Sequence, residues 1–336
     1  PDVFKTANFG SRPKENFPVL RRHQPQGPLM CCEFWNGWFD HWDSEHHTRD
    51  VQDAAQCLDD MLAMGASVNL YMFHGGTNFG FMNGANRDDV LNCTVTSYDY
   101  DSPVSECGDL TPKYYAFQSV LEKHFGKAPQ IEVSNLPKKA YGQVSLTQKA
   151  AVLDNLDALS TPIESACTLP MERVGQNTGF ILYRTFIPGP MPERELHIQE
   201  VRDRATVFVN GENKGVIYRD RPHDPILIGA AAGEVVRLDI LGENMGRVNY
   251  GPSLRDNKGI TEGVRLGIQF LFDWKIYPMP MEDLSGLRYQ DGGCLQGPAF
   301  WKGTFTVHEK ADTFLRVDTL SKGVVFLNGF NLGRYW

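Results

Sequence analysis

The first third of the chain alternates short apolar runs with a segment of helical periodicity. Residues 28–32 form a continuous apolar run, typical of a strand covered on both faces, and we expect it to stop at Glu33. Apolar positions within residues 51–62 recur at spacings of three and four, which predicts a helix capped by Thr48. A second apolar run, residues 67–73, follows. This order predicts a βα unit whose parallel strands end at the same edge of a sheet, where such folds place their sites.

A further helix is predicted after a long loop. Pro112 favours the first turn of a helix, and Gly126 is a typical residue for its end. From about residue 127 onward the pattern changes to short strands with turn signals and almost no helical periodicity. We therefore expect an α/β part followed by an all-β part.

The all-β part contains an internal repeat. Residues 207–215 and 325–333 each carry an Asn-Gly pair between two apolar runs, which predicts a hairpin with a tight type I′ turn. The repeat predicts two related β-sandwiches, the second cut off before its closing strands. The expected domains are an α/β domain over residues 1–127, a sandwich over 128–281 and the start of a second sandwich over 282–336.

Composition narrows the class of protein. Of the 336 residues, 41% are hydrophobic and 22% are charged, which indicates a folded globular protein. The net charge of −8, without a basic run, argues against a nucleic-acid partner. No apolar stretch reaches the length of a membrane span. Seven cysteines without a Cys-x-x-Cys pair favour buried thiols over a disulfide framework or a zinc ribbon.

Glu33 is the first candidate for chemistry. It follows an apolar strand and precedes an aromatic-rich segment, residues 34–42, so its carboxylate is partly desolvated among ring faces. Sugars bind such places, because their C–H faces stack on aromatic rings while their hydroxyls donate hydrogen bonds to carboxylates. We expect Trp35 and Trp38 to be sugar platforms. The alternatives are that Glu33 pairs with a loop arginine and that tryptophans of this segment pack in the core.

Two further groups of polar residues are candidates for binding a ligand or a metal. Residues 98–103 offer hydroxyls and carboxylates to a polar ligand, although they also fit an acidic loop or a weak calcium site. His41, His46 and His47 suggest a metal, but no His-x-x-x-His pair and no cysteine at ligand spacing accompanies them. We therefore expect no metal centre.

Five motifs in order resemble the β-galactosidases of glycoside hydrolase family 35. They are residues 33–42, 69–80, 96–101, 246–251 and 331–336. The likeness spans nearly the whole chain and is closest to the bacterial branch with a compact barrel. It implies the C-terminal part of a (β/α)8 TIM barrel followed by two galactose-binding-like, jelly-roll sandwiches, the second incomplete. Together with the cysteine usage, it favours the cytoplasm over secretion.

The resemblance also implies roles for individual residues. Glu33 matches the family's catalytic nucleophile at the end of the seventh barrel strand, Tyr71 matches a tyrosine beside it at the end of the eighth, and Tyr100 matches one that contacts galactose. The family's general acid/base is a glutamate in an Asn-Glu-Tyr motif, which this sequence lacks. We therefore expect the acid/base and the first five or so barrel strands to be absent from this chain. Asp40 and Glu106 are the nearest alternatives for the acid.

The resulting hypothesis is a retaining exo-β-galactosidase that hydrolyses terminal non-reducing β-D-galactose from galactosides by a two-carboxylate double displacement. The substrate is a β-galactoside oligosaccharide, no cofactor is expected, and the resemblance allows a homodimer. The chain alone is expected to be inactive. The main alternative is a non-catalytic galactoside-binding protein, which the missing acid/base motivates. A third hypothesis is a metal-binding enzyme that uses the histidines.

Overall fold

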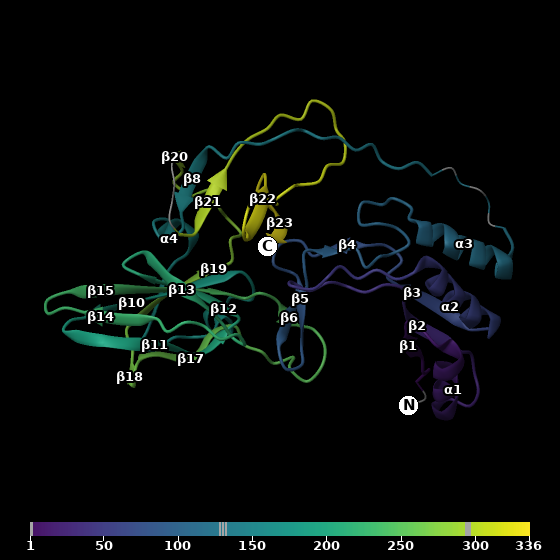
Figure 1. Cartoon of the computed structure of the whole chain (residues 1–336), viewed down its shortest axis with the longest axis horizontal. Coiled ribbons are helices and arrows are strands. Elements are labelled where there is room, and N and C mark those ends of the chain that lie inside the picture. Colours follow the sequence, from purple (N-terminus) through teal and green to yellow (C-terminus); the bar gives the residue numbers. More distant parts are fainter. Residues whose placement is uncertain (1–2, 128, 130, 132, 293–296) are drawn as a thin grey trace.

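The computed structural model describes residues 3–127, 129, 131, 133–292 and 297–336. They form three parts (Figure 1): an α/β part at one end, a large β-sandwich at the other, and a smaller β part that contains the C-terminus. The order of an α/β part followed by strands agrees with the expected fold class.

Three parallel strands and three helices build the α/β part. They are β1 (Ala7–Phe9), α1 (Pro13–His23), β2 (Met30–Trp35), α2 (Val51–Ala63), β3 (Ser67–Tyr71) and α3 (Pro112–Phe125). The sheet order is β1-β2-β3. Cys31 and Phe34 of β2 are fully buried in one apolar cluster with Leu58 and Met61 of α2. The helices thus cover one face of the sheet, and the opposite face is free to carry polar side chains.

The strand β2 is longer than the sequence pattern predicts. We expected it to stop at Glu33, but pairing with β3 continues through Phe34 and Trp35. A shift of register between Cys31 and Phe34 adds an extra residue, so both of these side chains reach the helix-covered face. The apolar run breaks at Glu33 because the strand turns a polar residue to the other face, and not because the strand ends.

The helix α2 begins differently from the prediction. Its N-cap is Asp50, whose carboxylate accepts a hydrogen bond from the backbone N–H of Asp53 at 2.8 Å. Thr48 lies two residues too early to fill this role. Aspartate and threonine are both favourable N-cap residues. Which of them caps the helix therefore depends on where the helical backbone begins. The end of α3 is as expected, with Gly126 as its C-cap.

The first sandwich consists of two antiparallel sheets. Their orders are β13-β12-β15-β10-β19-β9 and β14-β11-β17-β18. The strands are β9 (Ile163–Ser165), β10 (Phe180–Pro188), β11 (Met191–Arg202), β12 (Arg204–Val209), β13 (Glu212–Tyr218), β14 (Leu227–Ala230), β15 (Val235–Glu243), β17 (Gly259–Leu266), β18 (Gln269–Phe270) and β19 (Trp274–Met279). Ile181 and Leu238 of one sheet and Leu196 and Val264 of the other are buried in one core. Two single helical turns, α4 (Leu156–Leu159) and a 3-10 turn (Met171–Val174), precede the main strands.

The predicted hairpin repeat is confirmed. The first copy is β12 and β13, and the second is β22 (Gly323–Leu327) and β23 (Phe330–Tyr335). Asn210 and Asn328 have φ angles of 51° and 50°, and each is followed by a glycine with positive φ. These are the angles that a type I′ turn needs.

The smaller β part includes a strand from before the first sandwich. β8 (Gln148–Ala151) pairs with β20 (Gln290–Asp291) and β21 (Ala299–Lys302). We placed β8 inside the first sandwich, but its hydrogen bonds join it to strands beyond residue 281. The small β part is therefore discontinuous in sequence, because it contains β8 from before the sandwich and β20 and β21 from after it. The boundaries predicted from composition otherwise stay a prediction.

A long loop of the α/β part packs against the sandwich. It contains β4 (Gly76–Thr77), β5 (Gly84–Arg87), β6 (Leu91–Cys93) and β7 (Ser97–Tyr98). β5 pairs with β6 and with β16 (Arg247–Val248), which follows the sandwich strand β15. Ala85, Cys93, Met245 and Val248 bury one another at this contact.

Arg334 of β23 connects all three parts. Its guanidinium donates to the Asn83 side chain of the loop at 3.1 Å and to the Glu243 carboxylate of the sandwich at 2.6 Å. Lys322 adds a second cation to Glu243 at 2.6 Å. Although burial opposes it, these cations hold the pKa of Glu243 below its ordinary value.

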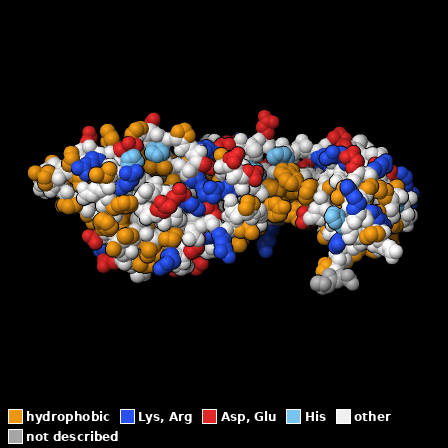
Figure 2. Space-filling view, turned by 90° about the horizontal axis from the view of Figure 1, so that it is seen from below, with side chains coloured by type: hydrophobic (Ala, Val, Ile, Leu, Met, Phe, Trp, Pro, Cys, Tyr) orange, Lys and Arg blue, Asp and Glu red, His pale blue; other side chains and the backbone are white. Residues whose placement is uncertain are grey.

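The surface is of mixed character. Figure 2 shows charged side chains of both signs spread over the viewed face. Apolar side chains gather in the narrower region between the two larger masses of the molecule. Within the described residues, no helix has both the length and the apolar character that crossing a membrane requires. The six cysteines in this part of the chain are free thiols, three of them buried.

Candidate active site

Glu33 lies on the face of the sheet that the helices leave uncovered. Trp35, two residues further along β2, shares that face, and its indole N–H donates to the Glu33 carboxylate at 3.0 Å. Among the described residues no arginine pairs with Glu33, so the alternative of a loop salt bridge is not supported. Glu33 is half-buried and keeps oxygen lone pairs for a ligand.

Two tyrosines approach this carboxylate from neighbouring segments. Tyr71 ends β3 directly beside Trp35 in the sheet register. Tyr100 follows β7, and its ring meets the Tyr71 ring edge-on at 5.6 Å. Burial, followed by the proximity of Tyr71 and Glu33, raises the pKa of Tyr100 above its ordinary value. The hydroxyl therefore keeps its proton and serves as a hydrogen-bond donor.

Further aromatic rings complete a box around the two tyrosines, which we call the aromatic box. It comprises Trp35, Trp38, Phe39, Tyr71, Tyr98 and Tyr100. Phe39 stacks between Trp38 at 4.9 Å and Tyr98 at 5.6 Å. Tyr98 in turn stacks on Tyr100 at 5.6 Å. The structure thus brings together all five predicted site residues, although a platform role for Trp35 and Trp38 stays a prediction.

Phe39 and Tyr98 are not among the individually predicted site residues, although Tyr98 belongs to the polar segment 98–103. Burial, followed by a hydrogen bond with Tyr71, raises the pKa of Tyr98. The presence of Tyr98 in that polar segment was a usable signal. Phe39 offered no comparable signal among so many aromatic neighbours.

A buried lysine fixes the loops that carry the aromatic box. Lys113 of α3 is 1% exposed, and its ammonium donates to the carbonyl of Asn36 at 2.8 Å and to the Asp101 carboxylate at 2.7 Å. Burial lowers the pKa of Lys113, while the bond to Asp101 opposes that shift. The loop after β2 and the loop after β7 are therefore tied to the same helix.

Gly37 permits these two loops to touch. A Cβ atom at this position would lie 1.7 Å from the carbonyl oxygen of Tyr100, which no side chain could tolerate. The close backbone approach requires glycine here.

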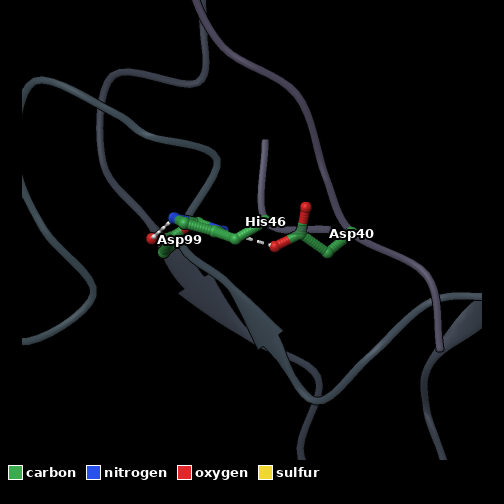
Figure 3. A group of neighbouring side chains, drawn as sticks. All are labelled: Asp40, His46 and Asp99. Atoms are coloured by element: carbon green, nitrogen blue, oxygen red, sulfur yellow. Dashed lines mark hydrogen bonds and ion pairs between the residues drawn. The ribbon is translucent and has the colours of Figure 1, made fainter. Parts of the chain in front are cut away.

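The histidines next to the aromatic box do not form one cluster. His41 bonds to Asn86 at 3.0 Å, whereas His46 lies between Asp40 and Asp99 (Figure 3). Both nitrogens of the His46 ring face carboxylates, Nδ1 at 2.6 Å from Asp40 and Nε2 at 3.5 Å from Asp99. A metal ion binds one nitrogen of an imidazole, whereas a protonated ring carries hydrogen on both nitrogens and can donate to Asp40 while it forms an ion pair with Asp99. The geometry therefore favours a proton at His46 over a metal.

The two carboxylates considered as substitutes for the general acid are engaged elsewhere. Glu106 accepts hydrogen bonds from the hydroxyls of Thr77 and Ser97. Asp40 accepts from His46 and His47. Glu33 is thus the carboxylate that the described part of the chain brings to the aromatic box with free lone pairs.

A carboxylate among aromatic rings at the end of parallel strands, followed by β-sandwiches, is typical of proteins that act on carbohydrates. Comparison with known families supports this class. Residues 1–124 match the glycosyl hydrolases of family 35, residues 168–280 the first all-beta domain of beta-galactosidases, and residues 298–336 their galactose-binding domain. The chain belongs to glycosyl hydrolase family 35.

Individual relatives agree with the family. Over 99% of its length the chain is 40% identical to a beta-galactosidase of Bos taurus and 41% identical to one of Homo sapiens. It is 39% identical to a beta-galactosidase-1-like protein of Mus musculus. The chain covers 55%, 53% and 54% of these proteins, respectively, so it spans about half the length of the curated relatives it matches. These relatives are mammalian, and the expected bacterial branch stays a prediction.

Proposed function

We propose that the chain carries the nucleophile of a retaining exo-β-galactosidase, which hydrolyses terminal non-reducing β-D-galactose from galactosides. The observation that supports this most is Glu33, held by Trp35 and facing Tyr71 and Tyr100. The choice of galactose as the sugar, and of its β-linkage, follows the relatives that are named beta-galactosidase.

In this proposal Glu33 attacks the anomeric carbon and forms a covalent galactosyl-enzyme. The indole N–H of Trp35 orients the carboxylate toward the anomeric carbon. The tyrosine hydroxyls donate to sugar oxygens or to the nucleophile. The aromatic faces exclude water and stack on the C–H face of galactose.

A second carboxylate, about 5 Å from the first, must protonate the leaving oxygen and then deprotonate water. The Asn-Glu-Tyr motif that carries it in the family does not occur in these 336 residues. The proposal therefore concerns a polypeptide of the relatives' length that contains this chain, called the full-length protein below. The second candidate is a non-catalytic galactoside-binding protein, favoured by the same missing motif.

The test combines stereochemistry with covalent trapping. The full-length protein should release galactose as the β-anomer at early times, observed by proton NMR. A 2-deoxy-2-fluoro-galactoside with a good leaving group should leave one sugar mass on the peptide that contains Glu33. Release of the α-anomer would contradict retention, and galactoside binding without any hydrolysis would support the non-catalytic alternative.

A further inference from the structure

His46 joins the two segments that form the walls of the aromatic box. Asp40, its first partner, directly follows Phe39, and Asp99, its second, lies between Tyr98 and Tyr100. Figure 3 shows the imidazole ring between the two carboxylates. One side chain outside the box thus ties both walls together.

The neighbouring carboxylate of Asp101 does not depend on His46 for its contacts. Asp101 is paired with the buried Lys113 and accepts the backbone N–H of Arg49. For Asp99, by contrast, His46 is the one cationic side chain within ion-pair distance in the described part of the chain. The contact between the loop after β2 and Asp99 therefore depends on His46.

The double contact requires a charged ring. A neutral imidazole that donates to Asp40 from Nδ1 presents a lone pair at Nε2 to the Asp99 carboxylate, so only the charged ring is attracted to both. The groups facing His46 are the carboxylates of Asp40, Asp99 and Asp101, and His47 donates to the other oxygen of Asp40 at 2.8 Å. The hydrogen bond to Asp40, opposed by partial burial and aided by Asp99 and Asp101, raises the pKa of His46.

We propose that His46 is a positioning residue for the sugar site: in its charged form it bridges Asp40 and Asp99 and so holds Phe39, Tyr98 and Tyr100 in the geometry that binds galactose. This inference rests on the proposed function, because it assigns the aromatic box to galactose.

The sign of the pH effect follows from linkage. Because the pKa of His46 is raised, the bridge is complete below the ordinary histidine value of about 6.5 and is lost as pH rises through the higher value in the folded protein. Galactose affinity should therefore fall on the alkaline side. Since 53% of the His46 side chain is exposed, water screens the bridge, and the change should be about 2- to 5-fold.

The experiment measures the dissociation constant of galactose against pH for the full-length protein and three variants. His46→Gln is neutral at every pH and should bind galactose about 2- to 5-fold more weakly than wild type at pH 5, with a flat profile up to pH 8. His46→Lys keeps a cation throughout and should retain more of the affinity at pH 8. His223→Gln changes an exposed histidine whose polar contact, among the residues that the structure describes, is with the backbone carbonyl of Asp224, and it should match wild type.

The outcomes separate this inference from the proposed function. If His46→Gln keeps the wild-type affinity and pH profile, His46 is not a positioning residue, whatever the enzyme hydrolyses. If wild-type protein binds no galactose at all, the proposed function fails, and the inference fails with it. A loss of affinity in His46→Gln that is the same at every pH from 5 to 8, with wild type also flat, would contradict the role of the charge.

Discussion

The indole N–H of Trp35 donates to the carboxylate of Glu33 at 3.0 Å, from a position two residues further along the same strand. This contact exists because β2 continues past Glu33, so that both side chains project from the same face. The backbone of Glu33 is paired with Asn8 of β1, and the pairing of β2 with β3 resumes at Phe34, so the proposed nucleophile lies within a strand and not in a loop.

Replacing Trp35 by phenylalanine should keep the ring but remove the donor. A hydrogen bond to a charged group contributes about 1.5–3 kcal/mol, so kcat/KM for a chromogenic β-galactoside should fall about 10- to 100-fold in the full-length protein. Trp301→Phe, on an exposed strand of the small β part, is the matched control and should have no effect. Equal activity of Trp35→Phe and wild type would show that this bond does not assist the nucleophile.

Glu33→Gln should abolish turnover while leaving the fold intact. Glutamine preserves the shape and can still accept from Trp35, but it cannot attack the anomeric carbon. The expected loss in kcat is several orders of magnitude, and circular dichroism should be unchanged. Glu282→Gln, an exposed residue outside the α/β part, controls for the loss of one negative charge. Activity of Glu33→Gln within tenfold of wild type would falsify the assignment.

Tyr71→Phe and Tyr100→Phe should each lower kcat/KM roughly 10- to 1,000-fold with little change in stability. Each hydroxyl is expected to donate more strongly in the transition state than in the ground state, while the rings keep their packing. Tyr115→Phe on the exposed face of α3 is the control. If both site variants retain wild-type kinetics, the tyrosines only pack, and galactose binds elsewhere.

Sequence reasoning predicted which candidate residues lie close together better than it predicted the boundaries of the parts. Glu33, Tyr71 and the Trp35 region could be placed at one sheet edge because parallel strands joined by a helix end on the same side. The pairing of β8 with β20 and β21 could not be predicted, since it joins residues more than a hundred positions apart and leaves no local pattern. The salt bridge of Lys113 with Asp101 could not be predicted either, because a lysine in a helix usually lies on the side that faces solvent.

The first sandwich should fold without the rest of the chain. Its two sheets enclose their own core, and β8 is not part of either sheet. A fragment of residues 161–281 should therefore show a single cooperative thermal transition by circular dichroism. Extending it back to residue 146 restores Val152 and Leu156, which are buried against Leu182 of the sandwich, so the midpoint should rise. A non-cooperative melt of both fragments would show that contacts with residues beyond 281 are required for folding.

The buried carboxylate of Asp256 should make the stability of the sandwich depend on acid pH. Arg219 and Lys258 donate to it at 2.7 and 3.0 Å, and, although burial opposes them, they lower its pKa. A lowered pKa contributes stability above the unfolded value of about 4, and that contribution is lost as pH falls toward the folded value.

Asp256→Asn should consequently reduce the free energy of unfolding of the sandwich at pH 7 by about 1.5–3 kcal/mol, because it removes one of the two carboxylates, Asp203 and Asp256, that pair with the buried Arg219 and Lys258. The difference from wild type should shrink as pH falls below about 4, where the Asp256 carboxylate of the unfolded wild-type chain begins to bind a proton. Asp318→Asn, whose only ionic partner in the described residues is the exposed Arg316, should leave the unfolding midpoint of the full-length protein unchanged. A deficit in Asp256→Asn that stays constant from pH 7 to pH 2.5 would mean that packing, and not charge, accounts for the effect of the substitution.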